Sequence, residues 1–112
     1  MAIKVDIFAK NLKVTERIED YLNKKITKLY RYLNDIEETR VDLSYLKSAR
    51  SASDRQVAQI TIRGRGYILR TEERAEDIFA AIDEAIEKMQ RQIARLKGKR
   101  DKGRGDGTPL SE

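Results

Sequence analysis

Apolar residues near the C-terminal end of the chain recur at the spacing of an α-helix, and this periodicity constrains the fold more than any other feature. Successive positions are separated by 4, 4, 3, 4 and 3 residues, which follows the roughly 3.6 residues of a helical turn. They are Ile78, Ile82, Ile86, Met89, Ile93 and Leu96. The spacing predicts a helix that begins between Ala75 and Asp77, ends near Lys97 and buries one face.

A second amphipathic helix is predicted after a short strand at the N-terminus. Residues 2–9 alternate, with Ile3, Val5 and Ile7 on one side, which indicates a strand with one buried face. Thr15 is a suitable helix N-cap, and the apolar residues after it follow helical spacing to about residue 33. These are Ile18, Tyr21, Leu22, Ile26, Leu29, Tyr30 and Leu33.

Further strands are expected between the two helices. Period-two alternation covers residues 37–47 and 56–63, Gly64-Arg65-Gly66 marks a hairpin, and residues 67–71 form a short last strand. The order β-α-β-β-β-α predicts an α+β fold, a two-layer sandwich with a four-stranded sheet and two helices on one face. The first crossover favours one parallel pairing, and the other sheet face must meet water or a ligand.

The apolar period ends at Gly98, after which glycine and charged residues dominate. We therefore predict a single domain over residues 1–97. Residues 98–112 are expected to form a flexible, glycine-rich basic tail or the start of a linker, because such a segment cannot offset its ordering entropy.

Composition argues against an enzyme. The chain has no cysteine and no histidine, which removes thiol chemistry, disulfides and the usual zinc ligands. Asp83 and Glu87 lie one helical turn apart, but a solvated pair explains them better than acid–base catalysis. Gly64-Arg65-Gly66 lacks the strand-to-helix context of a nucleotide loop. We expect no catalytic residues, no cofactor and no metal, and a cytoplasmic protein without signal peptide or membrane span.

Charge changes sign abruptly towards the C-terminus. Residues 71–87 hold seven acids and one base, whereas residues 88–104 hold eight bases and one acid. Such an order complements the helix dipole, but that effect fades within the last turn. Together with the net charge of +5, the long cationic run indicates a polyanionic partner.

Basic side chains form two rows at helical spacing. One row is Lys88, Arg91 and Arg95, with Gln92 beside it. Arginine can bind two phosphate oxygens at once, and lysine acts as a mobile charge, so two rows on neighbouring helices could straddle a phosphate-lined groove. The alternative is two ordinary solvated faces, supported by pairs such as Glu84–Lys88 and Glu87–Arg91. The other row is Lys24, Lys28 and Arg31, with Lys25 at its boundary.

Other basic and aromatic residues have competing explanations. The loop and hairpin strands carry further cations, which could bind phosphate or discourage sheet-to-sheet aggregation. Tyr30, Tyr32, Tyr45 and Tyr67 could stack on nucleobases, although core packing with a surface hydroxyl is the commoner role. The cations are Lys47, Arg50, Arg55, Arg63, Arg65, Arg70 and Arg74.

Two segments resemble a known protein family. Residues 10–29, KNLKVTERIEDYLNKKITKL, place a valine-threonine, a tyrosine and paired lysines after an asparagine-containing turn. Residues 76–99, EDIFAAIDEAIEKMQRQIARLKGK, place Phe79 before Ala-Ala-Ile-Asp and a basic, glutamine-bearing run. Both are similar to helix motifs of the ribosome hibernation-promoting factors, which include ribosome-associated inhibitor A and are also catalogued as sigma-54 modulation proteins. The resemblance covers residues 3–97. It departs at Phe79, where tyrosine is commoner, and at the basic hairpin of residues 63–66.

The resemblance implies a fold akin to double-stranded-RNA-binding domains and a stress-response factor that inhibits translation by idle ribosomes. It implies binding to rRNA of the small ribosomal subunit, in competition with mRNA and tRNA for their channel. Arg63, Arg65 and Arg70 are candidates for additional phosphate contacts. The expected rRNA contacts are the two basic rows and residues next to them: Lys24, Lys25, Lys28, Arg31, Lys88, Arg91, Gln92, Arg95 and Lys97.

Alternatives remain open at the level of the sequence. The chain could be a general double-stranded-RNA-binding module, or a regulator that binds another protein, in line with the sigma-factor label. Within the resembling family it could be a short member, or the N-terminal part of a long factor whose C-terminal domain pairs ribosomes. A chain of this length is expected to be monomeric.

Overall fold

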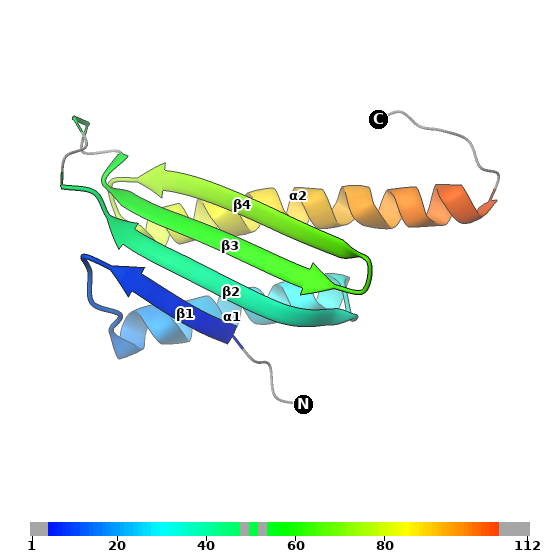
Figure 1. The fold of residues 1–112 in the computed structure, drawn as a ribbon, viewed down its shortest axis with the longest axis horizontal. Coiled ribbons are helices and arrows are strands. Elements are labelled where there is room, and N and C mark those ends of the chain that lie inside the picture. Colours follow the sequence, from blue (N-terminus) through cyan, green and yellow to red (C-terminus); the bar gives the residue numbers. More distant parts are fainter. Residues whose placement is uncertain (1–4, 48–49, 52–53, 106–112) are drawn as a thin grey trace.

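Two helices cover one face of a four-stranded sheet in the computed structural model, which describes residues 5–47, 50–51 and 54–105, the last six by backbone only (Figure 1). The elements are β1 (Val5–Lys10), α1 (Glu16–Tyr32), β2 (Ile36–Tyr45), β3 (Gln56–Gly64), β4 (Tyr67–Ala75) and α2 (Ile78–Gly105). The strand order is β1-β2-β3-β4, with β1 parallel to β2 and the other neighbours antiparallel. The predicted α+β fold and its parallel pairing are confirmed. Residues 2–4 of the predicted first strand, including Ile3, lie outside the described residues.

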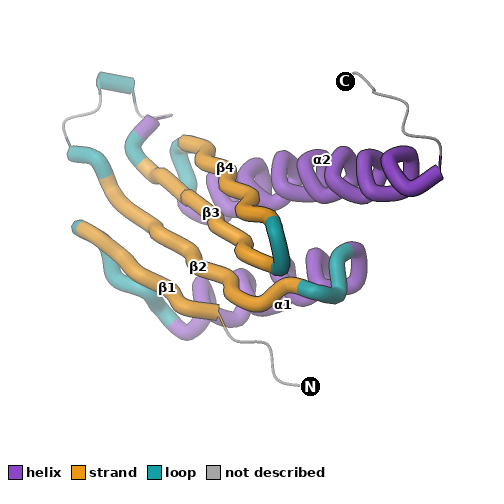
Figure 2. Tube along the Cα trace, turned by 45° about the vertical axis from the view of Figure 1, so that its right-hand side comes forward, coloured by secondary structure: helices purple, strands orange, loops and turns teal. Residues whose placement is uncertain are grey.

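The hydrophobic core lies between the sheet and the helices, which Figure 2 shows on the same side of the strands. Leu22 and Ile26 of α1 and Ile82 and Met89 of α2 are completely buried. Removing these apolar side chains from water is the main favourable contribution to folding. Of the predicted α2 stripe, only Leu96 stays half-buried. The strands contribute Val41, Leu43, Ala58, Ile60 and Ile62.

Local sequence signals account for the first helix and the hairpin. The Thr15 hydroxyl accepts a hydrogen bond from the Ile18 backbone N–H at 3.2 Å, which confirms the predicted N-cap. β3 and β4 are joined by the two-residue turn Arg65-Gly66, where Gly66 has a φ of 81° that glycine adopts without strain. A side chain at Gly64 would overlap the Tyr67 ring, so glycine is required there by close approach.

The predicted end of β4 is wrong, because the strand continues to Ala75 instead of stopping at Thr71. Its inward-facing positions alternate correctly, but they are filled by Thr71, Glu73 and Ala75, which give no strong apolar signal. The Thr71 hydroxyl donates to the Ala85 carbonyl at 3.0 Å, so this buried polar group is satisfied by α2. Polar inward positions therefore concealed half of the strand.

The predicted end of α2 near Lys97 is also wrong, because the helix continues to Gly105 and extends past the sheet (Figure 1). Gly98 within a helix costs about 1 kcal/mol relative to alanine, which weakens a helix without forbidding it. Basic residues in the last turns also complement the helix dipole. The flexible tail at residues 98–112 stays a prediction, and residues 106–112 lie outside the described residues. Neither described helix is long and apolar enough to cross a membrane.

We expect Ile82→Ala to lower the free energy of unfolding by about 2–5 kcal/mol, because it opens a cavity in the core. Ile82 has no exposed surface, whereas Ile68 on β4 is 64% exposed. The matched control Ile68→Ala should therefore change stability by no more than about 1 kcal/mol. Urea unfolding measures both, and equal losses for the two variants would contradict this core assignment.

Candidate nucleic-acid interface

The α1 basic row consists of Lys24, Lys28 and Arg31, and all three side chains are exposed. None of them forms an ion pair with a residue that the structure describes. Lys25, at the boundary of the row, is half-buried, and its Nζ lies 3.7 Å from Asp83 Oδ1 on α2. The α1 basic row thus presents cations whose charge is not already neutralised by a neighbouring carboxylate.

The α2 basic row, Lys88, Arg91 and Arg95, is also exposed and lies on the side of α2 next to β4. Lys88 Nζ forms an ion pair with Glu73 of β4, and Gln92 Nε2 donates to the Arg70 carbonyl at 3.1 Å. A self-neutralised face would require the ion pairs Glu84–Lys88 and Glu87–Arg91. Neither pair forms among the residues that the structure describes. Arg91 and Arg95 have no carboxylate partner within the described part of the chain.

The two rows flank a groove between the helices, and they do not face each other across it. This inter-helix groove is lined by Lys25 and Lys28 of α1 and by Asp83, Glu87 and Gln90 of α2, with Ile86 at its base. Two carboxylates in the groove oppose entry of phosphate by like-charge repulsion. The arrangement favours phosphate contacts on the outer sides of the rows, while the groove itself presents both signs of charge.

A cluster around Asp83 fixes the two helices relative to each other. The Tyr21 hydroxyl donates a hydrogen bond to Asp83 Oδ1 at 2.5 Å. The Tyr21 and Phe79 rings meet edge to face, with centroids 5.1 Å apart, and the Arg17 guanidinium lies 5.3 Å from the Phe79 centroid. The hydrogen bond to Asp83 is the main cause that raises the pKa of Tyr21 to about 12, followed by burial and the Asp83 charge.

Sequence reasoning interpreted Asp83 as part of a solvated pair and missed this cluster. The available signal was that Tyr21 and Lys25 lie one turn apart on α1, so one acid on a neighbouring helix could contact both. Phe79, noted as a departure from the usual tyrosine, packs its ring on Tyr21 without needing a hydroxyl.

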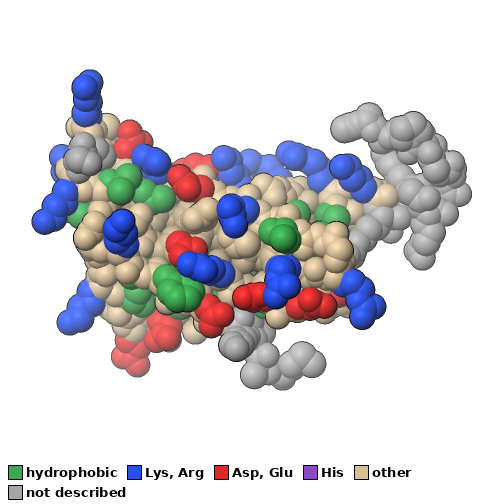
Figure 3. Space-filling model, viewed as in Figure 1, with side chains coloured by type: hydrophobic (Ala, Val, Ile, Leu, Met, Phe, Trp, Pro, Cys, Tyr) green, Lys and Arg blue, Asp and Glu red, His purple; other side chains and the backbone are tan. Residues whose placement is uncertain are grey.

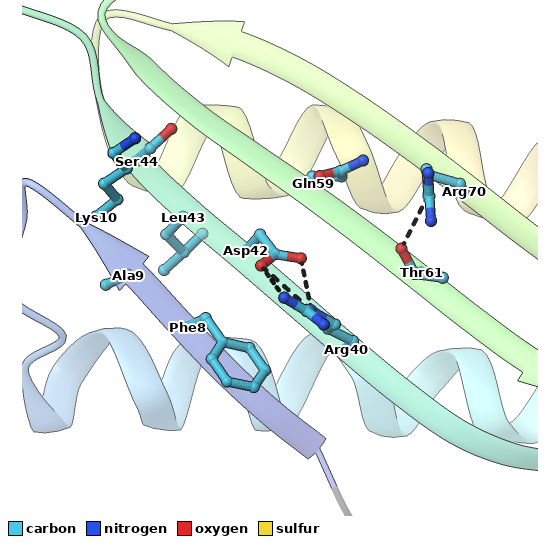
Figure 4. Close-up of a pocket in the computed structure, with 10 residues that line it drawn as sticks. All are labelled: Phe8, Ala9, Lys10, Arg40, Asp42, Leu43, Ser44, Gln59, Thr61 and Arg70. Carbon is cyan, nitrogen blue, oxygen red and sulfur yellow. Dashed lines mark hydrogen bonds and ion pairs between the residues drawn. The ribbon is translucent and has the colours of Figure 1, made fainter.

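The open face of the sheet carries charge that is largely paired. Arg40 binds Asp42 with Nε to Oδ2 at 3.1 Å, and Arg74 lies 3.6 Å from Glu72. Figure 3 shows basic and acidic side chains intermingled over this face. Around the shallow depression of Figure 4, the Arg40 guanidinium also lies 4.3 Å from the Phe8 ring centroid. This face therefore offers little unbalanced positive charge.

The three additional phosphate candidates belong to this sheet face and its turn. Arg63 forms an ion pair with Glu38, which raises the pKa of the Arg63 guanidinium, and Arg70 Nε donates to Thr61 Oγ1 at 3.3 Å. Arg65 is exposed in the hairpin turn. Arg63 and Arg65 belong to the hairpin end of the sheet, whereas the Arg70 backbone accepts from Gln92 beside the α2 basic row. Among the residues described, no group of three or more acidic residues is arranged to hold a metal ion.

Comparison with known protein families gives a match over residues 5–101, to the family described as Sigma 54 modulation protein / S30EA ribosomal protein. The ribosome hibernation promotion factor of Deinococcus radiodurans is 33% identical over 100 residues, covering 89% of this chain and 52% of that protein. The Staphylococcus aureus protein of the same name is 32% identical over 107 residues, with coverages of 93% and 55%. The chain spans about half the length of the curated relatives it matches.

Solved structures with the same fold include the N-terminal domain of Protein Y from Thermus thermophilus. That domain matches with a TM-score of 0.70 and 33% identity, over 86% of this chain and 99% of its own. A ribosomal subunit interface protein from Coxiella burnetii matches with a TM-score of 0.75 over 85% of this chain and 98% of its own. At 12% identity the second similarity supports the fold alone.

We expect the Tyr21 phenol to titrate near pH 12 in the folded protein, against about 10 when unfolded. Because the folded state favours the protonated phenol, this stabilisation is fully present below pH 10 and is lost as the pH rises from 10 to 12. Phenolate absorbance of the wild type minus that of Tyr21→Phe isolates the titration. Asp83→Asn should move the midpoint down towards 10, and a wild-type midpoint already near 10 would contradict the hydrogen bond.

Proposed function

This chain belongs to the Sigma 54 modulation protein / S30EA ribosomal protein family, and from that membership we propose that it is a ribosome hibernation factor. It binds the small ribosomal subunit in the channel used by mRNA and tRNA, and it inhibits idle ribosomes by occupying that space. The relatives named ribosome hibernation promotion factor support the hibernation role. The charge distribution of the domain supports rRNA as the surface that it binds.

The observation that carries the proposal is the contrast between the two layers of the domain. On the helical layer, Arg31, Arg91 and Arg95 are exposed without carboxylate partners among the described residues. On the sheet face, Arg40 and Arg74 are held by acids on the same strand. A surface that binds RNA must replace the counterions around phosphates with its own cations. The helical layer meets this requirement, and the sheet face does so poorly.

The mechanism is electrostatic and steric, and no covalent bond is made or broken. Guanidinium groups of the two rows bind phosphate oxygens in charge-assisted hydrogen bonds. The Tyr21–Asp83 hydrogen bond keeps α1 and α2 in one relative position, so the rows reach the rRNA as a rigid pair. Folded RNA displays its phosphates and sugar hydroxyls more than its base edges, so shape dominates recognition. Once bound, the domain excludes mRNA and tRNA by volume.

Neutralising Arg91 and Arg95 together, as Arg91→Gln and Arg95→Gln, should weaken binding to isolated small subunits. Loss of two phosphate contacts lowers the slope of log affinity against log salt by about 1.4–1.8. Thermal unfolding should hardly change, because both side chains are exposed. Co-sedimentation with small subunits over a range of KCl concentrations measures the affinity and the slope.

The matched control is the pair Arg40→Gln and Arg74→Gln, which removes the same charge from the sheet face. Because both arginines are paired with acids there, this control should leave the affinity and the salt slope close to those of the wild type. If the two double variants lowered the affinity for small subunits equally, binding would depend on net charge alone, which would contradict the helical interface.

We further expect the domain to lower the output of a cell-free translation system and to reduce tRNA occupancy of small subunits, because it occupies their channel. Occupancy is measured by filter binding of labelled tRNA as the protein is titrated, and the Arg91/Arg95 double variant should need a higher concentration for the same effect. Undiminished tRNA occupancy at saturating protein would reject occlusion. Equal affinity for free duplex RNA and for small subunits would instead favour a general double-stranded-RNA-binding module.

A further inference from the structure

Tyr32, the last residue of α1, is the most exposed tyrosine in the described part of the chain. The hydroxyls of Tyr21, Tyr30 and Tyr67 are engaged with Asp83, Thr39 and Asp35, respectively. Tyr32 is 52% exposed and makes no hydrogen bond or ring contact within the described residues. Its ring therefore lies at the surface of the helical layer, where a ligand can reach it.

The Tyr32 ring lines a notch at the end of the inter-helix groove. This tyrosine notch has a volume of about 420 Å³. Gln90 lines both the groove and the notch, so the two are neighbours. Ile93 and Ala94 give the notch an apolar lining, and Lys97 also lines it. It is lined by Tyr32, Gln90, Ile93, Ala94, Lys97 and Gly98.

We propose that the tyrosine notch binds one unstacked nucleobase of a single-stranded or bulged RNA segment. The base stacks on the Tyr32 ring, the Gln90 amide hydrogen-bonds its edge, and Lys97 binds the phosphate attached to it. Aromatic stacking is tolerant of base identity because every base has a π-face. An amide can both donate and accept, so Gln90 suits several base edges. The inference deepens the proposed function, on which it rests for the identity of the RNA.

The charges around the notch favour a nucleotide over an apolar protein side chain. Arg31 precedes Tyr32 on α1, and Lys97 lines the notch itself. The carboxylates Asp83 and Glu87 line the adjoining groove and not the notch. The negative charge of a nucleotide's phosphate neutralises these cations, whereas an aliphatic side chain carries no charge that could do so. A duplex cannot supply the base, because its bases are paired and its deep groove is closed to side chains. The notch therefore selects a flipped or looped nucleotide.

The test compares a short single-stranded oligouridylate with an abasic oligomer of the same backbone, using fluorescence anisotropy over a range of KCl concentrations. Tyr32→Ala should weaken binding of the oligouridylate by about fivefold to 150-fold, the loss typical of one stacked base. It should leave the salt slope unchanged and hardly affect the abasic oligomer. Tyr32→Phe keeps the ring and should retain wild-type affinity.

Two further variants distinguish binding of a base in the notch from electrostatic binding of the RNA backbone. Lys97→Gln should weaken both oligomers and lower the salt slope by about 0.7, as expected for one phosphate contact with a single strand. Ala94→Leu places a larger apolar side chain in the notch at little cost in helix propensity, and it should abolish the preference for the base-bearing oligomer. Circular dichroism and thermal unfolding establish that each variant is folded.

Equal binding of the two oligomers by the wild type, or binding of neither, would overturn the nucleobase assignment. Weaker small-subunit binding by Tyr32→Ala with unchanged oligouridylate binding would also overturn it, because the notch would then contact a ribosomal protein. A different result would reject the proposed function alone. In that case the wild type would not bind small subunits but would still prefer the base-bearing oligomer.

Discussion

Both amphipathic helices bury their apolar stripes on the same face of one sheet, and this constraint determines where the remaining side chains can lie. Leu22 and Ile26 of α1 and Ile82 and Met89 of α2 have no exposed surface. Because the stripes share one core, the helices must lie side by side, and their outer surfaces form one layer. No helix of the described residues covers the other sheet face, which carries mainly polar and charged side chains together with the exposed Phe8 and Ile68. The burial pattern thus gives the domain two chemically different faces.

Charge is distributed between these faces in different ways. Arg40, Arg63 and Arg74 on the sheet face pair with acids on their own or the adjacent strand, so most of the positive charge of that surface is balanced. On the helical layer two acids, Asp83 and Glu87, line the groove, where Asp83 binds both Tyr21 and Lys25. The outer rows are left cationic. Asp83 therefore contributes to the interface indirectly. It joins the two helices, and it does not neutralise the exposed arginines of the outer rows.

The sequence was sufficient for the order of the elements, the fold class and both buried stripes, because helical and strand periodicities are local properties. It was insufficient where a residue's role depends on a partner distant in the chain. Asp83 could not be paired with Tyr21 from spacing alone, since the two are joined only by the packing of α1 on α2. Thr71 and Glu73 concealed the end of β4 because their inward positions are satisfied by α2. Gly98 suggested a helix end, but a glycine only weakens a helix.

The most direct measurement of the central claim is a cryo-electron microscopy structure of this chain bound to small ribosomal subunits at physiological salt. We expect density in the mRNA and tRNA channel, with the helical layer against rRNA. The guanidinium groups of Arg91 and Arg95 should lie within hydrogen-bond distance of phosphate oxygens, at about 3 Å, and the sheet face should point away from the rRNA. Density outside the channel, or a domain bound through its sheet face, would rule out occlusion by the helical layer.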